Sequence, residues 1–168
     1  MIGFLRVAGI CAAAASIWIV GASRVPSHEK LPLNAIVPGA VMTQSFGCSN
    51  LILEPFDPYC PSRHVHTGVD LAAREGTPVR AAAGGSVSVA FDPNGAGLYV
   101  IVVVDRHVRV LYCHLSVAAV GGAERVVTGQ LIGEVGSTGL STGAHLHFEV
   151  QVDGRAVDPV LWVAGSAS

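Results

Sequence analysis

The 168-residue sequence has few charged or aromatic residues and no useful stretch with the apolar periodicity of a helix. Charged residues make up 13% of the chain and aromatic residues 6%, which argues against a charge-rich coiled coil. The 10 basic residues are scattered singly and the formal net charge is -2. Nothing therefore indicates a nucleic acid or an anionic membrane surface as a partner. The sequence also has no CxxC pair, the usual signature of a structural zinc knuckle.

Glycine is abundant, with 20 residues, and beyond residue 41 the chain consists of short β-like runs separated by turn signals. Runs rich in β-branched residues predict strands within 78–89 (broken by a turn at Gly84-Gly85) and at 98–105, 108–115 and 144–152. We therefore expect an all-β fold, a compact antiparallel sheet domain over residues 41–160. Its edges would form a groove for an extended peptide, and we expect a monomer.

The first 24 residues differ from the rest of the chain. Residues 7–22 form a 16-residue run without a charge, which is short for a bilayer span and typical of a secretory signal peptide. The alternative is an uncleaved signal-anchor, which would be the chain's only contact with a membrane. Either way we predict a protein exported from the cytoplasm, with a linker at 25–40 and a C-terminal tail at 161–168.

Two cysteines outside the export segment, Cys48 and Cys60, flank a turn-rich stretch. An oxidising compartment would let them pair, so we predict a disulfide between them. Cys113 lies within the predicted strand at 108–115, where a buried lone thiol is the favoured interpretation.

Seven histidines are many for this length, and five of them fall in three clusters, at 64–66, 114 and 145–147. Alternate side chains of a strand share a face, so His145, His147 and Glu149 should point one way and the apolar residues between them into the core. Two imidazoles about 6–7 Å apart along one strand can serve one metal site. One would bind the ion and the other would contact the water bound to that ion.

His66 and Asp70 are four residues apart, and a straight strand would separate them by roughly 13 Å. Gly68 permits a sharp bend that would fold the Asp70 carboxylate back toward His66. Two histidine nitrogens, one carboxylate oxygen and a fourth position open to water are the usual donors of catalytic zinc. His64 is the alternative first ligand, but the spacing to Asp70 and the adjacent Gly68 favour His66. His64 would then lie at the edge of the groove.

Taken together, these segments resemble the LytM/lysostaphin-type zinc peptidases, the M23 family of peptidoglycan endopeptidases. The resemblance covers about residues 41–159, and its strength lies in the order and spacing of several motifs. They are HTGVDLA at 66–72, GTPV at 76–79, LYCHLS at 111–116, GQLIG at 129–133 and STGLSTGAHLHFEV at 137–150.

The resemblance implies one zinc ion per chain, bound by His66, Asp70 and His147. It implies that His114 and His145 are the catalytic residues, which flank the bound water and the scissile carbonyl. It further implies a groove that holds a peptidoglycan peptide and hydrolysis of peptide bonds in the stem or cross-link.

Two features depart from the family pattern. Cys113 stands where the family usually carries a small residue such as alanine, and the insertion between Cys48 and Cys60 could alter one wall of the groove. The three implied metal ligands and the two implied catalytic histidines are all present in the sequence, which favours an active enzyme over a non-catalytic wall-binding or hydrolase-activating module. A peptidase acting on a non-wall protein is the remaining alternative. Glu149 is interpreted as a structural hydrogen-bond partner rather than a general base, because in the family two histidines fill that role.

Overall fold

The computed structural model describes residues 30–165, so the predicted export segment at 1–24 lies outside the described residues. Within this described part the chain folds into short strands and two short helices, α1 (Leu33–Ile36) and α2 (Pro159–Val163). The strands are β1 (Val41–Gln44), β2 (Gly47–Ser49), β3 (His64–His66), β4 (Gly68–Ala72), β5 (Pro78–Arg80), β6 (Gly85–Asp92), β7 (Gly97–Val103), β8 (Val108–Leu115), β9 (Val117–Ala118), β10 (Arg125–Val126), β11 (Leu131–Glu134), β12 (His145–Val152) and β13 (Arg155–Val157).

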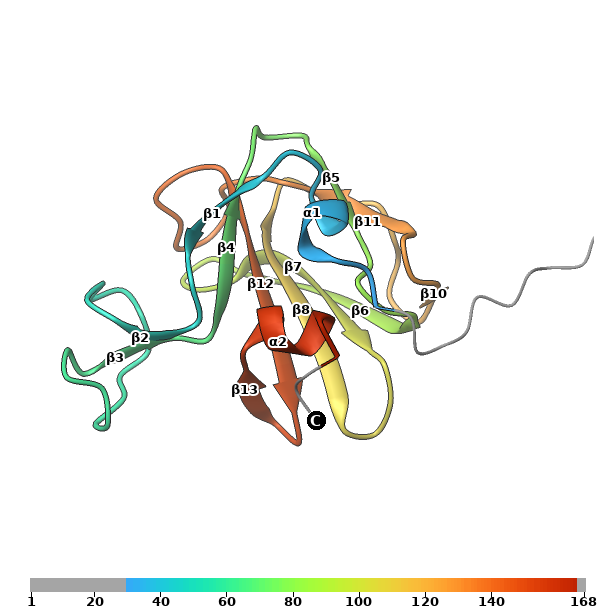
Figure 1. Cartoon of the computed structure of the whole chain (residues 1–168). Helices are drawn as coiled ribbons and strands as arrows, with labels where there is room; N and C mark the ends of the chain where they lie inside the picture. The colour runs from blue at the N-terminus through green and yellow to red at the C-terminus, as the bar shows by residue number, and fades with distance from the viewer. Residues whose placement is uncertain (1–29, 166–168) are drawn as a thin grey trace, which may run out of the picture.

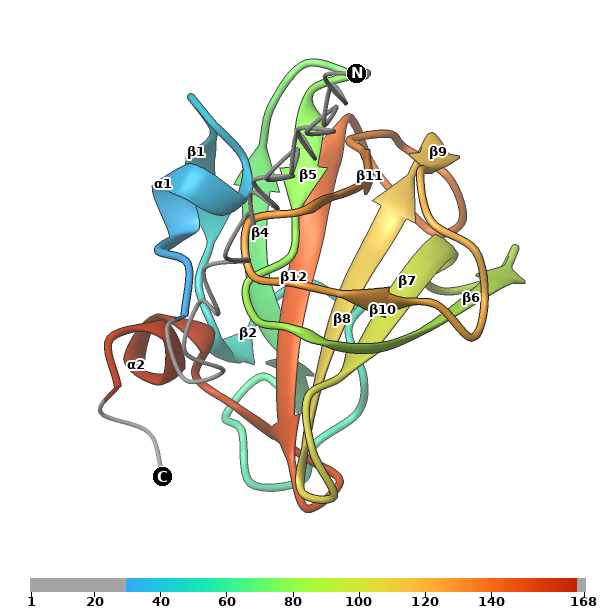
Figure 2. The same ribbon diagram turned by 90° about the vertical axis from the view of Figure 1, so that its right-hand side faces the viewer.

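One large antiparallel sheet dominates the fold, with the strand order β1-β4-β12-β8-β7-β6-β10 and β13 paired to the end of β12. Figure 2 shows β4, β12, β8 and β7 side by side in the middle of this sheet. A three-stranded sheet, β5-β11-β9, and a two-stranded sheet, β2-β3, complete the architecture. The predicted all-β, antiparallel fold is confirmed.

Strand β12 separates the hydrophobic core from the face that carries the histidines. Leu146, Phe148 and Val150 have no exposed surface, and they pack with buried residues of β7 and β8. The alternate residues His145 and His147 lie on the other face and remain partly exposed. Because side chains alternate along a strand, burial of one set fixes the direction of the other.

The ends of the described chain pack on the domain where a linker and a tail were expected. Ile36 and Val37 have no exposed surface, and Trp162 of α2 is 3% exposed. The apolar residues scattered among the prolines and glycines of these segments cover the core, which local composition alone did not indicate. Parts of the predicted linker and tail, within residues 30–40 and 161–163, thus pack against the core.

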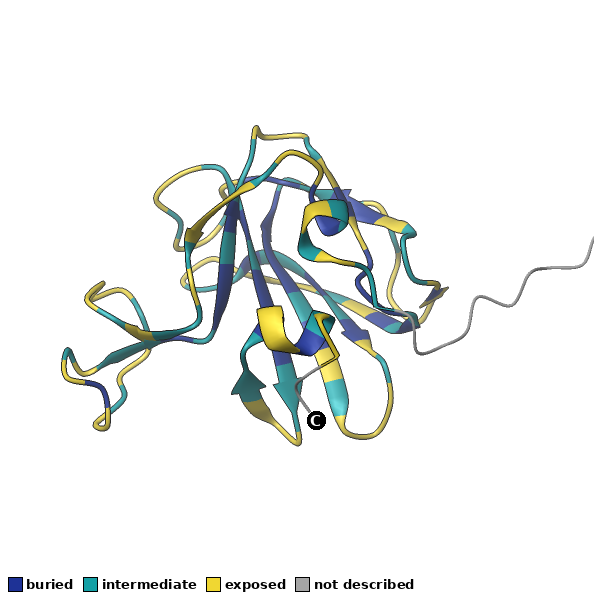
Figure 3. Cartoon of the chain, viewed as in Figure 1, coloured by how far each residue is buried: buried dark blue, intermediate teal, exposed yellow. Residues whose placement is uncertain are grey.

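The β2-β3 pair and its connecting loop project from one side of the main sheet (Figure 1). Figure 3 shows this region mostly exposed or half-buried, whereas buried residues concentrate in the central strands. The Sγ atoms of Cys48 and Cys60 are bonded to each other and close the loop, the pairing that the sequence indicates. Among the described residues, no helix combines the length and apolar character needed to cross a membrane.

Candidate metal centre

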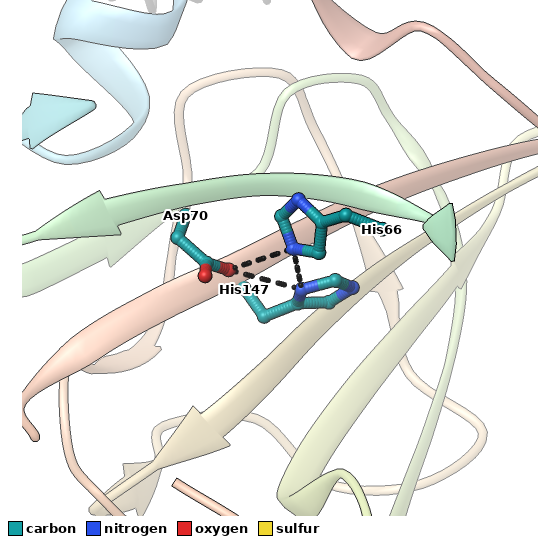
Figure 4. Close-up of side chains that lie close together, drawn as sticks. All are labelled: His66, Asp70 and His147. Atoms are coloured by element: carbon teal, nitrogen blue, oxygen red, sulfur yellow. Dashed lines mark hydrogen bonds and ion pairs between the residues drawn. The ribbon is translucent and has the colours of Figure 1, made fainter. Parts of the chain in front are cut away.

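Three side chains from neighbouring strands meet on the face of β4 and β12 (Figure 4). Asp70 of β4 lies directly opposite His147 of β12 in the sheet register, and His66 is the last residue of β3. The His66 Nε2 atom lies 3.0 Å from His147 Nδ1 and 3.1 Å from Asp70 Oδ1. His147 Nδ1 lies 3.1 Å from the same Asp70 oxygen. The structure thus brings together the three residues that the sequence analysis assigned to a metal.

The chain changes direction at Thr67, between β3 and β4, which belong to different sheets. The predicted bend therefore lies at Thr67, and Gly68, the first residue of β4, is not in the left-handed region. A Cβ atom at Gly68 would lie 2.4 Å from the Phe148 carbonyl oxygen and 2.9 Å from His147 Nε2. The glycine is needed because β12 and the His147 ring approach this backbone too closely for any side chain.

Hydrogen bonds on the far side of each ring select the nitrogen that faces the centre. We assign the His66 Nδ1 proton to a bond with the Ser45 carbonyl oxygen at 3.0 Å, which leaves a lone pair on Nε2. His147 Nε2 lies 3.5 Å from Glu149 Oε2, which leaves a lone pair on Nδ1. Together with Asp70 Oδ1, three electron-pair donors therefore converge on one point.

This donor set fits a tetrahedral metal ion. Zinc with ligand bonds of about 2.0–2.2 Å holds its ligand atoms roughly 3.3 Å apart, close to the observed 3.0–3.1 Å. Imidazole and carboxylate donors are those of catalytic zinc sites, and metal-bound histidines commonly direct their second nitrogen to a carbonyl or carboxylate, as His66 and His147 do.

The electrostatics of the centre also favour a cation. Burial would raise the pKa of Asp70, but hydrogen bonds with His147 and His66 outweigh it and hold that pKa well below its usual range. Burial would lower the pKa of His147, but its bonds to Asp70 and Glu149 prevail and raise it to about 9. A positive charge is therefore stabilised at this point, whether it is a proton or a metal ion.

Cys113 borders the centre from β8, opposite His147 in the sheet register. Burial raises the pKa of its thiol to about 12, and the charges of Glu149 and Asp70 act in the same direction. The thiol therefore stays protonated near neutral pH, whereas a metal ligand must be the thiolate. The structure gives Cys113 the place of a buried, inert thiol, as predicted from the sequence.

Glu149 supports the centre from the side of His147 that faces away from Asp70. Its carboxylate accepts hydrogen bonds from Thr67 Oγ1 at 2.6 Å and from Gln151 Nε2. Burial would raise the pKa of Glu149, but its bonds with His147, Thr67 and Gln151 outweigh that effect and lower it. The carboxylate is ionised, fully bonded and 9% exposed, in agreement with the predicted structural role.

His114 enters the groove from a β-bulge near the end of β8. The pairing of β7 with β8 runs from Leu98↔Leu115 to Val100↔Tyr112, so β8 has an extra residue here. His114 has φ +64°, an uncommon conformation for a side-chain-bearing residue and one often found at functional sites. Its Nδ1 donates to the Thr138 carbonyl oxygen at 2.8 Å and leaves Nε2 as the acceptor.

His145 lies beside His114, with ring centroids 4.7 Å apart. His145 Nδ1 donates to the Gly143 carbonyl oxygen at 2.7 Å, and Nε2 lies 3.7 Å from Asp70 Oδ1. Burial lowers the pKa of His114, although the Thr138 carbonyl acts in the opposite direction. The two rings stand next to the three convergent donors without being part of them.

His64, the alternative first ligand, lies outside the centre. Its Nδ1 atom is 2.8 Å from the Glu54 carbonyl oxygen, in the disulfide-closed loop. The structure therefore gives His64 a supporting position beside the loop.

A groove of about 410 Å³ runs over the centre. One wall comes from the β2-β3 loop and the other from the turns around residues 94–96 and 140–142. The polar groups at its floor are His66, Asp70, His114, His145 and His147.

The model of peptidase family M23 matches residues 64–159, more than half of the chain. The chain belongs to peptidase family M23. All five histidine and aspartate positions on the floor of the groove fall within the matched residues.

Among relatives of this M23 chain, the DD-carboxypeptidase/endopeptidase Mpg of Neisseria meningitidis serogroup B is 47% identical over 97 residues, 57% of this chain and 22% of Mpg. The peptidoglycan DD-endopeptidase ShyA of Vibrio cholerae is 40% identical over 93 residues, 55% of this chain and 22% of ShyA. A zinc-containing peptidase from Vibrio cholerae superimposes with a TM-score of 0.65 at 30% identity, over 78% of this chain and 40% of that structure. The M23 chain thus spans about a fifth of the length of these sequence relatives.

Two groups that orient the M23 centre were missed from the sequence, Gln151 and Thr138. Gln151 shares a strand face with His147 and Glu149, so the two-residue period could have identified it. Thr138 offers its carbonyl to His114, accepts from Leu98 N at 2.9 Å and donates to Leu115 O at 2.8 Å. No local pattern indicates that contact, because it depends on a loop far away in the sequence.

Proposed function

We propose that this chain is a zinc metalloendopeptidase that hydrolyses peptide bonds in the stem or cross-link peptides of peptidoglycan. The observation that carries the proposal is the convergence of three oriented electron-pair donors at 3.0–3.1 Å, beneath a groove and beside two further imidazoles. Family membership supports the reaction class, the similarity to the peptidoglycan DD-endopeptidase ShyA supports the substrate, and the similarity to the zinc-containing peptidase supports the metal.

The proposed ligands are His66 through Nε2, Asp70 through one carboxylate oxygen and His147 through Nδ1. A zinc ion bound there would polarise the scissile carbonyl and lower the pKa of a water molecule toward ~7. Glu149 and the Ser45 carbonyl keep the two imidazoles in the required tautomers. One zinc per chain and a monomeric enzyme form part of the proposal.

His114 and His145 are the proposed proton-transfer residues. Each ring uses Nδ1 to bond a backbone carbonyl, so each presents Nε2 to the reacting groups. The lowered pKa of His114 keeps it neutral near pH 7 and able to accept a proton from the attacking water. Its protonated form, or that of His145, then donates to the leaving amine or to the developing oxyanion.

Because the proposed substrate, peptidoglycan, lies outside the cytoplasm, the proposed site of action lies there too. Residues 1–24 have the sequence character of a signal peptide or signal-anchor, and the Cys48–Cys60 disulfide suits an oxidising compartment. We propose an extracellular, periplasmic or wall-associated location, with membrane contact only through the N-terminal segment if it is retained.

Digestion of purified peptidoglycan followed by mass analysis tests the proposal. The expected result is release of fragments with new peptide ends, loss of this activity after chelation, and recovery on addition of zinc. Binding to peptidoglycan without new ends would identify a non-catalytic module. Cleavage of a protein but not of peptidoglycan would identify a different substrate.

A further inference from the structure

The wall of the groove formed by the β2-β3 loop lies outside the residues that match the family, 64–159. Leu51, Leu53, Glu54 and Pro55 of this loop line the groove. Leu51 is 40% exposed and Leu53 46% exposed, a large exposure for leucine beside a site. The loop thus offers a substrate apolar contact with one carboxylate among the apolar residues.

Glu54 is held in a fixed position from two sides. Its carbonyl oxygen accepts from His64 Nδ1 at 2.8 Å, and its carboxylate accepts through Oε1 from Gln44 Nε2 at 2.9 Å. Gln44 Nε2 is in turn 3.2 Å from Ser49 Oγ, next to Cys48 of the disulfide. A carboxylate that is already oriented loses little side-chain entropy when a ligand binds.

Glu54 is also the one groove-lining carboxylate in the described part of the chain that lacks a cationic or imidazole partner. Asp70 contacts two ligand histidines and Glu149 is bonded by three side chains, whereas no ion pair involves Glu54. Among residues 30–165, no lysine or arginine lines the groove. The groove therefore favours a positive group and disfavours a negative one at this wall.

We propose that Glu54 is a specificity-determining residue that binds an ammonium group of the substrate peptide, while Leu51 and Leu53 contact its aliphatic carbons. The ammonium belongs either to the side chain of a diamino-acid residue or to a peptide N-terminus. This inference rests on the proposed peptidase function, because it concerns how the same groove selects its substrate.

The test uses the zinc-loaded enzyme and compares pairs of peptide substrates that differ only in acetylation of one amine. One pair places the amine on the side chain of a diamino-acid residue and the other at the peptide N-terminus. For the wild-type enzyme, acetylation of the recognised amine should lower kcat/KM about fivefold to tenfold, mainly through KM, as for loss of a partly exposed charge-assisted hydrogen bond. Glu54→Gln keeps an acceptor for Gln44 but removes the charge, so it should lower kcat/KM for the free amine and leave the acetylated peptide unchanged.

Glu75→Gln, at an exposed turn away from the groove, is the matched control and should alter neither substrate. Equal hydrolysis of free and acetylated peptides by the wild-type enzyme in both pairs would overturn the role of Glu54 while leaving the peptidase function intact. This comparison needs no variant, so a poorly folded Glu54→Gln protein would not prevent a decision. Failure of the wild-type enzyme to cleave any of the peptides or peptidoglycan would instead count against the proposed function itself.

Discussion

The metal centre and the disulfide-closed loop at residues 48–60 border the same groove but are held by different means. Asp70 and His147 lie on the paired central strands β4 and β12, directly above a core that includes Phe148 and Leu146, both without exposed surface. The loop has little core of its own: Ile52 is 78% exposed and Tyr59 94% exposed. A disulfide and side-chain hydrogen bonds there replace the packing that the sheet supplies to the centre.

This difference suggests a division of labour. The reacting groups need positions fixed to within a fraction of an ångström, which a packed sheet provides. The substrate-contacting wall needs only to be ordered enough to reduce the entropy cost of binding. Changes at the centre should therefore affect metal binding and turnover, whereas changes in the loop should affect substrate affinity and leave the metal in place.

The largest effects should come from the paired histidines of β12. His147→Ala should lose zinc and activity together, because it removes one of three protein ligands. His145→Ala should retain near-stoichiometric zinc while hydrolysis falls about 10²–10⁴-fold, the usual contribution of a positioned acid–base group. His114→Ala should behave like His145→Ala. Atomic emission for zinc, measured beside turnover, distinguishes these outcomes.

His107→Ala is the control, since His107 lies at the exposed hairpin between β7 and β8 and should change neither zinc content nor turnover. Loss of zinc from His145→Ala together with its retention by His147→Ala would show that the two roles are reversed.

A smaller effect is expected at Glu149, which contacts the metal centre only through His147. Glu149→Gln keeps the size of the side chain but removes the charge that orients and polarises the imidazole. Zinc affinity should fall about 10–100-fold, the usual effect of losing such a partner. Competition with a chromophoric chelator measures it, and Glu124→Gln at the exposed surface is the control. At saturating zinc the variant should recover most of its turnover; unchanged affinity would mean that Glu149 only stabilises the fold.

The sequence predicted the centre better than its surroundings. The alternation of β12 correctly placed His145, His147 and Glu149 on one face, because a two-residue period depends only on local burial. The bulge that turns His114 into the groove, and the Thr138 carbonyl that holds it, depend on pairing between distant segments. Gly68 was singled out for the bend beside it, but the close approach of β12 to this glycine depends on pairing between distant segments.

The same limit applies to the edges of the domain and to its smaller sheets. The two strands predicted within 78–89 are present as β5 and β6, but the sequence did not indicate that β5 pairs with β11 in one sheet and β6 with β7 in another. Buried Ile36 and Val37 were assigned to a linker because prolines and glycines surround them. Composition identifies strands and turns, but the partner of each strand is set by the whole fold.

The pH dependence of metal binding should reveal the proton that the centre holds without its ion. His147 in the metal-free protein has its pKa raised to about 9, so it is protonated at pH 7 and must lose that proton to bind zinc. Apparent zinc affinity should therefore rise about tenfold per pH unit between pH 6 and 8, the dependence for one released proton. Chelator competition at three pH values gives the slope. A slope of zero would mean that His147 is already neutral or is not a ligand.

The smallest effect on the centre should come from removing the Cys48–Cys60 disulfide. Replacement of both cysteines by serine should lower the free energy of unfolding by up to about 3 kcal/mol, from the chain entropy of a loop this short. The loop would have to become ordered again on each substrate, which costs about 1 kcal/mol and should raise KM about fivefold with little change in kcat. Zinc content should stay the same, because no ligand and no residue that orients a ligand belongs to the loop.

Cys113→Ser is the comparison: its thiol lies beside His147 in the sheet, so any effect should appear in stability rather than in KM. Loss of zinc from the Cys48→Ser, Cys60→Ser protein would show that the loop and the centre form one unit, and the division between them would have to be abandoned.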